Sequence, residues 1–177
     1  MFGLKLLPRF YRLIRREYYI KLDGSQLFLN FLVQRIFRLN SEVPFSLHYT
    51  SRFQGYKNMK ISSKETLVCC AVSGGCYFTA FDGTTLEIGD GTYFAFNVCL
   101  QTGNHKADAM DEYETASIKI GRNCWLGNGA VVVAGVTLGD HVIVGANSVV
   151  TKSFPSNVLI AGAPAQVIRE LNEYKSK

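Results

Sequence analysis

Residues 120–155 read IGRNCW LGNGAV VVAGVT LGDHVI VGANSV VTKSFP, six units of six residues each. Each unit opens on an aliphatic side chain: Ile120, Leu126, Val132, Leu138, Val144 and Val150. Four of the six units continue with Gly. A period of six fits neither the helical turn of about 3.6 residues nor the heptad of a coiled coil. The pattern predicts short extended segments joined by tight corners, with Gly and Asn supplying the corner dihedrals.

A short fixed period is typical of a β-helix, in which each unit buries its aliphatic residue against the neighbouring coils. The repeats and the stretch VLIAGAPAQVIR at residues 158–169 resemble the hexapeptide-repeat acyltransferases. The resemblance is strongest to the polysaccharide O-acetyltransferases and to the maltose and galactoside O-acetyltransferases. It implies a left-handed parallel β-helix, a homotrimer and acetyl-coenzyme A (acetyl-CoA) as donor. Handedness rests on the resemblance alone, since ordinary parallel crossovers are right-handed.

The sequence pattern divides the chain into three parts. Residues 1–45 are basic and apolar with helical spacing, residues 46–160 form the β-helix, and residues 161–177 form a short helix over its open end. Pro164 suits the first turn of that C-terminal helix. The predicted fold class is mainly β: a left-handed parallel β-helix with an N-terminal helical segment and a short C-terminal helix.

Spacing also predicts where the coils begin and where the chain leaves them. Ile61 and Leu67 are one unit apart, which places the start of the first coil near Met59. Residues 88–105 make up three units, which is one full coil. Residues 106–117 then lack aliphatic openings and carry four acids against one Lys, which predicts a loop extruded from the coil.

The net charge of +5 lies entirely in the N-terminal segment. Residues 1–40 carry eight Lys and Arg against two acids, whereas residues 41–177 carry eleven against twelve. Apolar residues recur at helical spacing over residues 4–14 and 27–39. The favoured interpretation is two helices packed on the β-helix or on a neighbouring subunit. The alternative is a peripheral contact of residues 1–40 with anionic membrane lipid.

A membrane span, secretion and a nucleic-acid partner each fit the sequence less well than these two interpretations. Residues 27–39 include two Arg and are too short to cross a bilayer, and residues 1–20 lack the features of a signal peptide. Nucleic acid is not expected as a partner, since a basic arm alone offers no base-reading element. Five Cys without a CxxC pair favour a reducing cytoplasm. We therefore expect a cytoplasmic protein, with the inner face of the membrane as the alternative.

His105 is the candidate general base, because a neutral imidazole is suited to removing a proton from a hydroxyl near pH 7. It closes a predicted corner, Gly103-Asn104-His105, just before the extruded loop, and the resemblance places the family's catalytic His at this position. His141 is expected to be a solvent-exposed corner and His48 a packing residue. A metal is not expected, because the related γ-class carbonic anhydrases need paired His around the active coil.

The resemblance, carried over position by position, implies contacts with acetyl-CoA by Asn128, Ala146, Thr151, Lys152 and Arg169. A small side chain leaves room for the pantetheine arm, and the cations can meet phosphate charge. Candidate acceptor contacts are Asn97, Asn104 and Trp125. Each of these three also has a purely structural interpretation, as a corner residue or as packing at a subunit seam.

The sequence therefore predicts an O-acetyltransferase that moves acetyl from acetyl-CoA directly to a sugar hydroxyl in capsular or exopolysaccharide biosynthesis, with His105 as base. The stretch Ser73-Gly-Gly-Cys76 lacks the Asn found there in the sugar O-acetyltransferases, which favours a larger glycan over a simple free sugar. Two alternatives stay open. One is acetylation of a small acceptor such as serine, an antibiotic or an amino sugar, and the other is a non-catalytic trimeric scaffold.

Overall fold

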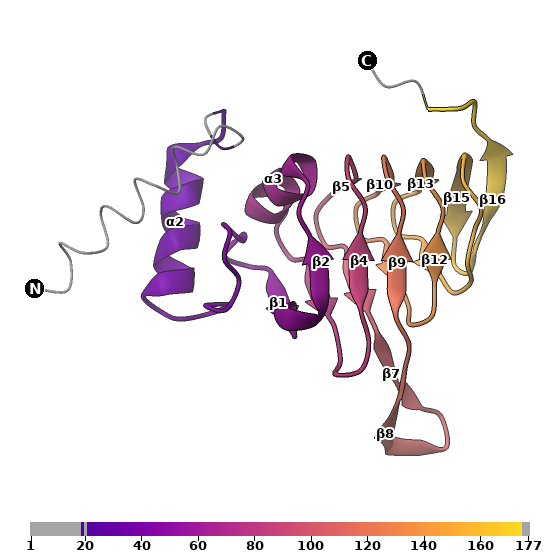
Figure 1. Ribbon diagram of the computed structural model, residues 1–177, viewed down its shortest axis with the longest axis horizontal. Coiled ribbons are helices and arrows are strands. Elements are labelled where there is room, and N and C mark those ends of the chain that lie inside the picture. The colour runs from indigo at the N-terminus through magenta and orange to yellow at the C-terminus, as the bar shows by residue number, and fades with distance from the viewer. Residues whose placement is uncertain (1–18, 20, 175–177) are drawn as a thin grey trace, which may run out of the picture.

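The computed structural model describes residue 19 and residues 21–174, most of which wind into a β-helix (Figure 1). In the view of Figure 1 the strands at the front rise, the chain crosses over the top to the back, and each coil advances to the right. This sense of winding is left-handed, as the resemblance implied.

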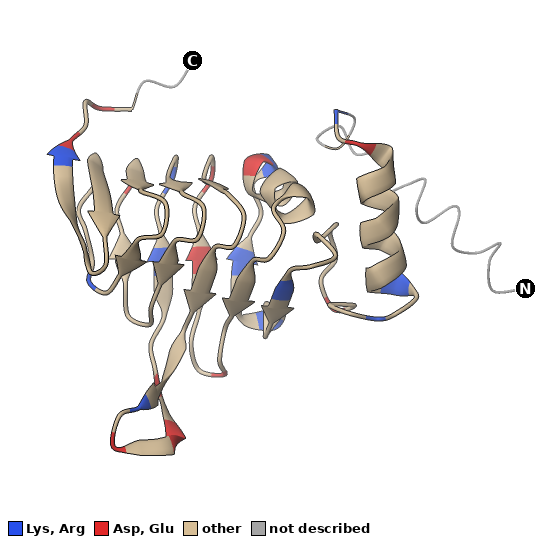
Figure 2. Cartoon of the chain, turned by 180° about the vertical axis from the view of Figure 1, so that it is seen from behind, with Lys and Arg blue, Asp and Glu red and all other residues tan. Residues whose placement is uncertain are grey.

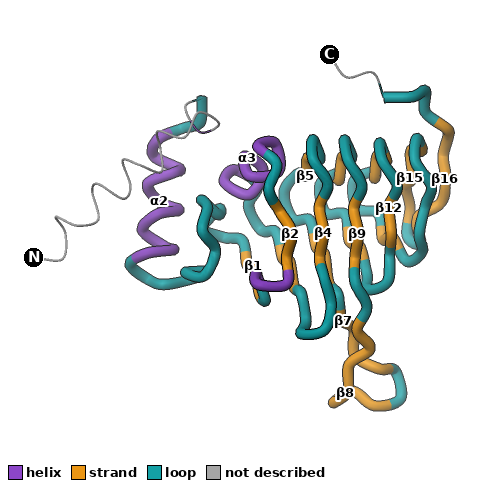
Figure 3. The backbone as a smooth tube through the Cα atoms, in the orientation of Figure 1, coloured by secondary structure: helices purple, strands orange, loops and turns teal. Residues whose placement is uncertain are grey.

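Three sheets form the faces of the β-helix. Sheet A contains β1 (Arg52–Gln54), β3 (Tyr77–Thr79), β6 (Cys99–Gln101), β11 (Val131–Val132) and β14 (Val149–Val150). Sheet B contains β2 (Met59–Ile61), β4 (Leu86–Ile88), β9 (Ile118–Ile120) and β12 (Thr137–Leu138). Sheet C contains β5 (Tyr93–Phe94), β10 (Trp125–Leu126), β13 (Val142–Val144), β15 (Val158–Gly162) and β16 (Ala165–Glu170). The chain visits the sheets in the repeating order B, C, A, so each coil has three corners (Figure 3).

The six-residue repeat sets the core. The six unit-opening residues of the sequence pattern are at most 1% exposed, and removing each aliphatic side chain from water stabilises the fold by about 1.5–3 kcal/mol. Trp125 pairs with Ile143, the residue three units further along the chain, so one coil is three units, as predicted. The sixth unit, however, is not complete. Leu138 bridges to Phe154 and not to Ser156, the position three units on, because the corner after β14 is shorter than the others.

Asn and Gly hold the corners, as the repeat predicted. Between sheets C and A, Asn97, Gly129 and Asn147 all have positive φ, at 59°, 69° and 54°. A Cβ on Gly129 would lie 2.3 Å from Oδ1 of Asn147, so the corners stack too closely for a side chain there. The backbone N–H of Asn147 donates to the backbone carbonyl of Asn128 in the coil before it (2.8 Å).

Among the described residues, α2 (Gly24–Arg35) precedes the β-helix, and α3 (Lys64–Val72) lies within its first coil. The helical spacing over residues 27–39 is confirmed in part: α2 covers residues 24–35 and residues 36–39 lie beyond its end. The buried face of α2 packs toward the β-helix. On that face the Asn30 amide donates to the carbonyl of Ala71 (2.9 Å), and that of Gln34 donates to the carbonyl of Phe45 (3.1 Å). The predicted helix over residues 4–14 lies outside the described residues. Between residues 21 and 174, neither helix is long and apolar enough to span a bilayer.

The first coil differs from the prediction. β2 does begin at Met59, but β1 precedes it in sheet A, and a short 3-10 helix, η3 (Tyr56–Asn58), joins the two. Leu67, predicted to open a strand unit, lies in α3 instead. The Ser63 side chain accepts a hydrogen bond from the amide of Thr66 and caps α3, which takes the place of a sheet C strand beside β5.

The predicted extruded loop is a two-stranded hairpin, β7 (Gly103–Lys106) and β8 (Ala109–Thr115), which hangs from the corner between sheets A and B (Figure 1). Because of this insertion Leu86 pairs with Ile118, whereas a coil of three units alone would have brought it to Asn104. The hairpin begins at Gly103, slightly before the predicted start of the loop at Lys106. The coils above and below it keep their parallel register.

The prediction of a C-terminal helix is wrong. Ala165–Glu170 is strand β16, which folds back after the cis Ala163–Pro164 peptide and pairs antiparallel with β15. Val167 and Ile168 are β-branched and favour extended backbone, and Ala165 is buried. Pairing with β15 also gives the backbone of the last sheet C strand hydrogen-bond partners that a helix would not supply.

Candidate active site

His105 lies within β7, opposite Tyr113 of β8, and not at a corner of the coil as the sequence predicted. The chain turns out of sheet A at Gly103. A Cβ there would lie 2.8 Å from the ring of Phe81, so the close approach of hairpin and coil requires glycine. His105 thus stands on the hairpin, exposed and beside sheet A.

A backbone carbonyl orients the His105 ring. Nδ1 lies 2.6 Å from the carbonyl oxygen of Met110, in strand β8 of the same hairpin. Because a carbonyl can only accept, Nδ1 carries the hydrogen and donates it, which leaves Nε2 of the neutral ring with a free lone pair. This is the tautomer that a general base needs. Nothing in the sequence indicated this partner, since every residue carries a backbone carbonyl.

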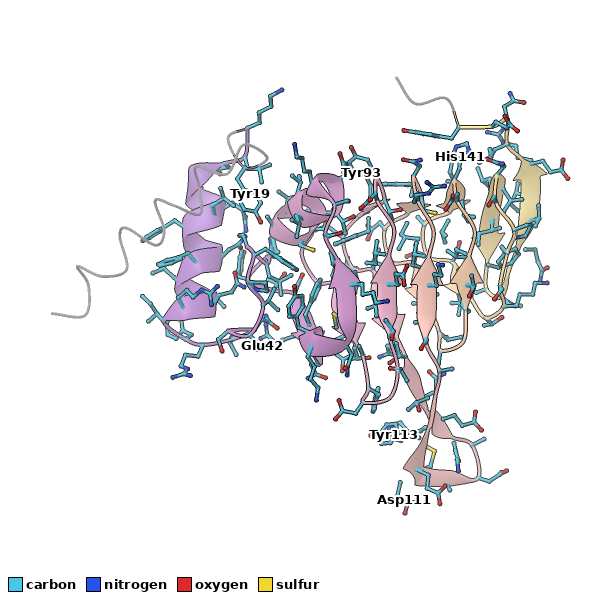
Figure 4. All side chains as sticks on the ribbon, in the orientation of Figure 1. Tyr19, Glu42, Tyr93, Asp111, Tyr113 and His141 are labelled. Carbon is cyan, nitrogen blue, oxygen red and sulfur yellow. The ribbon has the colours of Figure 1, made fainter. Side chains whose placement is uncertain are left out.

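Tyr113 packs beside the imidazole of His105, and Phe81 packs against Tyr113 in turn. The ring of Tyr113 lies 4.4 Å from the His105 ring and 5.1 Å from that of Phe81, measured between centroids. Figure 4 shows Tyr113 on the side of the hairpin that faces the earlier coils, with Asp111 near the tip. Between hairpin and sheet A lies a cavity of about 330 Å³ lined by Gln54, Tyr77, Thr79, Phe81, Gln101, Gly103, Asn104, His105 and Tyr113.

Of the three candidate acceptor residues, only Asn104 lines this cavity. Asn97 lies at the corner between sheets C and A. Trp125 projects from sheet C beside its register partner Tyr93, and the two side chains are 43% and 46% exposed. The remaining lining residues were missed from the sequence, although outward positions in the coil beside His105 would have indicated Gln101.

Four of the five residues carried over for acetyl-CoA lie along two corners. At the corner between sheets C and A, Asn97 donates to the Asn128 side chain (3.4 Å), with Ala146 exposed in the next coil. At the corner between sheets A and B, Thr151 and Lys152 follow β14.

Lys152 and Arg169, the two cationic residues carried over for acetyl-CoA, lie near the last coils. Lys152 donates to Gln166 (3.1 Å), and Arg169 lies in β16 opposite Leu159. Both are exposed. Sheet A separates Asn128 and Ala146 from the corner that carries His105, so one chain does not bring the whole set together.

The other His and the Cys are placed for structure. His48 is buried, stacks on Tyr49 and has its pKa lowered by burial. His141 is a half-buried corner whose Nδ1 meets Asn157 (3.1 Å), and not the solvent-exposed corner expected. Burial raises the pKa of the Cys76 thiol to about 11, which disfavours the thiolate a nucleophile needs. Within the described chain, His, Cys, Asp and Glu nowhere gather in a group of three or more that suits a metal.

Residues 117–152 match the family model "Bacterial transferase hexapeptide (six repeats)". A Staphylococcus aureus Mu50 protein named provisionally as acetyltransferase SAV2555 is 30% identical over 150 residues, which cover 80% of this chain and 69% of that protein. The chain belongs to the hexapeptide-repeat acetyltransferases. Its left-handed β-helix and its six-residue repeat are those of this family.

Other hexapeptide-repeat acetyltransferases match over the central coils. Galactoside O-acetyltransferase of Escherichia coli K12 is 43% identical over 99 residues, 54% of this chain and 49% of that protein. A protein of the same strain, provisionally named lipopolysaccharide biosynthesis O-acetyl transferase WbbJ, is 36% identical over 101 residues, covering 50% and 52%. The chain thus spans about half the length of these curated relatives.

A solved structure of the same kind also matches. A galactoside acetyltransferase in complex with coenzyme A is 31% identical, covers 75% of this chain and 62% of its own, and superimposes with a TM-score of 0.50.

Proposed function

We propose that this protein is an O-acetyltransferase that moves acetyl from acetyl-CoA to a sugar hydroxyl during surface-polysaccharide biosynthesis. One observation carries the proposal: Nδ1 of His105 is tied to the Met110 carbonyl, so Nε2 is free to accept a proton at the edge of a cavity. The names of the galactoside and lipopolysaccharide relatives support the acetyl donor and a sugar acceptor.

The transfer we propose is direct. Nε2 of His105 takes the proton of the acceptor hydroxyl while its oxygen attacks the thioester carbonyl of acetyl-CoA. The tetrahedral oxyanion then collapses, the C–S bond breaks, and the His105 imidazolium protonates the departing thiolate. A fixed N–H donor for the oxyanion is worth about 3–4 kcal/mol. The buried, high-pKa thiols give no reason to invoke an acyl-enzyme.

We propose that acetyl-CoA lies along the corner of Asn128 and Ala146, with phosphate met by Lys152 or Arg169. Exposure of Asn128, of the small Ala146 and of both cations fits this group. Because His105 lies across sheet A from Asn128, a complete site needs the corner of a second copy. A homotrimer would supply it, since each chain then offers His105 to one neighbour and Asn128 to the other.

The N-terminal segment supports a second proposal, a peripheral contact with anionic membrane lipid through residues 1–40. The outer side of α2 and the residues after it leave Leu29, Ile36 and Phe37 exposed, at 39%, 49% and 70%. Together with the net charge of +6 over residues 1–40, this surface suits lipid headgroups. Equal pelleting of the full chain and the Ile36→Ser/Phe37→Ser variant with anionic vesicles would rule this out.

The test of the main proposal is thiol release from acetyl-CoA over a panel of hydroxyl sugars, amino sugars and their oligomers. His105→Ala should lose about 100-fold or more in kcat on a hydroxyl acceptor, as removal of a general base does. His141→Ala, which changes a His at a corner remote from the cavity, is the matched control.

The panel also separates the alternatives. An amine acceptor needs less help from a base, so His105→Ala would slow an amino sugar less than an alcohol. Serine or an antibiotic as the preferred acceptor would favour the small-acceptor alternative. Tight acetyl-CoA binding without turnover on any acceptor, in wild type and variant alike, would favour a scaffold.

A further inference from the structure

The outward face of sheet A carries a row of uncharged polar side chains that ends beside His105. Gln54 of β1 is in register with Thr79 of β3, and Thr79 is in register with Gln101 of β6. All three line the cavity. Adjacent strands lie about 4.8 Å apart, so the row spans about 10 Å, more than one sugar ring occupies.

The opposite wall of the cavity is aromatic. Phe81, Tyr113 and His105 follow one another at ring distances of 5.1 Å and 4.4 Å. Within sheet A, the hydroxyl of Tyr77 donates to Oε1 of Gln54 (3.2 Å), which holds this amide at the edge of the cavity. A sugar ring has this same division, with apolar C–H faces and a rim of hydroxyls, and aromatic rings with polar partners suit both parts.

No Asp, Glu, Lys or Arg lines the cavity among the described residues. Several of the charged residues near the cavity have partners outside it. Lys106 pairs with Glu112 on the hairpin, whose charged residues gather toward its outer end in Figure 2, and Asp82 pairs with Lys57 (2.9 Å). Arg52, the register partner of Tyr77, donates to the carbonyl of Ser51 (3.1 Å). A ligand carboxylate would therefore find no cation inside the cavity.

We propose that this cavity is the acceptor subsite and that it selects an uncharged glycan of at least two linked rings. The ring to be acetylated packs against Tyr113 next to Nε2 of His105, and the following ring lies over Thr79 and Gln54. The inference rests on the proposed function and narrows its acceptor. Free serine, uronic acids and sialic acids are disfavoured, because each brings a carboxylate without a partner.

The experiment measures kcat/KM of the full chain with acetyl-CoA on neutral methyl disaccharides, on the same disaccharides ending in glucuronic acid, and on L-serine. Wild type should prefer a neutral disaccharide over its uronic-acid counterpart at least tenfold. Gln54→Lys places a cation in the cavity and should lower this preference at least tenfold. Thr137→Lys, which adds the same charge on the outward face of sheet B, should leave it within twofold.

Tyr113 is tested separately as a positioning residue. Tyr113→Ala should raise KM for the neutral disaccharide at least tenfold with KM for acetyl-CoA within twofold, and Tyr113→Phe should restore most of the loss. A wild-type preference for the uronic acid or serine overturns the inference, as does a Gln54→Lys effect no larger than that of Thr137→Lys. No turnover on any acceptor, or turnover on L-serine alone, overturns the proposed function itself, whereas turnover confined to the disaccharide ending in glucuronic acid overturns only this inference.

Discussion

Gly129→Ala tests whether close stacking of corners, and not the repeat pattern alone, holds the coils. Gly129 has φ of 69°, and a Cβ would lie 2.3 Å from Oδ1 of Asn147 in the next coil. A left-handed dihedral costs a residue with a Cβ about 1–2 kcal/mol. Turning the Asn147 amide away from its rotamer adds about 0.5–1.5 kcal/mol. We expect a loss of about 1.5–3.5 kcal/mol in the free energy of unfolding.

Gly83→Ala separates the two contributions, because Gly83 has φ of 82° with nothing within 4 Å of the added Cβ. It should lose only the dihedral part, about 1–2 kcal/mol. The assay is urea unfolding at one fixed protomer concentration, since subunit association shifts apparent stability. Asn147→Gly in the Gly129→Ala background removes the obstructing amide and should recover part of the loss. If Gly129→Ala is no more destabilising than Gly83→Ala, the stacking argument is refuted.

Two further predictions concern charge and thiols. Hydrogen bonds from Arg122 lower the pKa of Asp140 in the folded protein. The contribution of this carboxylate to the free energy of unfolding is therefore present above the unfolded-state pKa and is lost as pH falls through the lower folded value. The urea midpoint of wild type should therefore be higher than that of Asp140→Asn at pH 6 but not at pH 2. The same difference in midpoint at both pH values would contradict this. Cys76, 2% exposed and with a thiol pKa of about 11, should resist iodoacetamide at pH 8 until urea is added, as mass spectrometry of the labelled peptides would show.

The regular coils were predictable because their signal repeats. Val132 and Val144 are both buried because each occupies the first position of a six-residue unit. Asn and Gly could be placed at the corners because these residues tolerate the positive φ that the corners require. The ends of the array were not predictable in this way. Leu67 fits the repeat by spacing yet lies in α3. The Ser63 cap favours a helix there, and a terminal coil has a neighbouring coil on one side only.

The site was predicted in part, and the missing part has a physical cause. His105 was found, but its place in β7 and the carbonyl of Met110 depend on pairing across the hairpin, which no single residue encodes. Phe81 and Tyr113 are distant in sequence and meet only because the hairpin folds back over sheet A. Asn128 and Ala146 were identified by resemblance, with Thr151, Lys152 and Arg169, and their separation from His105 became visible only in three dimensions.

The two ends of sheet C determine how long the molecule can be. A stack of identical coils could in principle grow without limit, by adding repeats or by joining another molecule end to end. Here α3 covers β5 at one end, and β16 folds back along β15 at the other. Strand edges that are already covered give an incoming chain nothing to pair with, which guards against fibre formation. Duplication of one internal coil would lengthen the rod and leave both covers in place, so rod length and solubility can change independently.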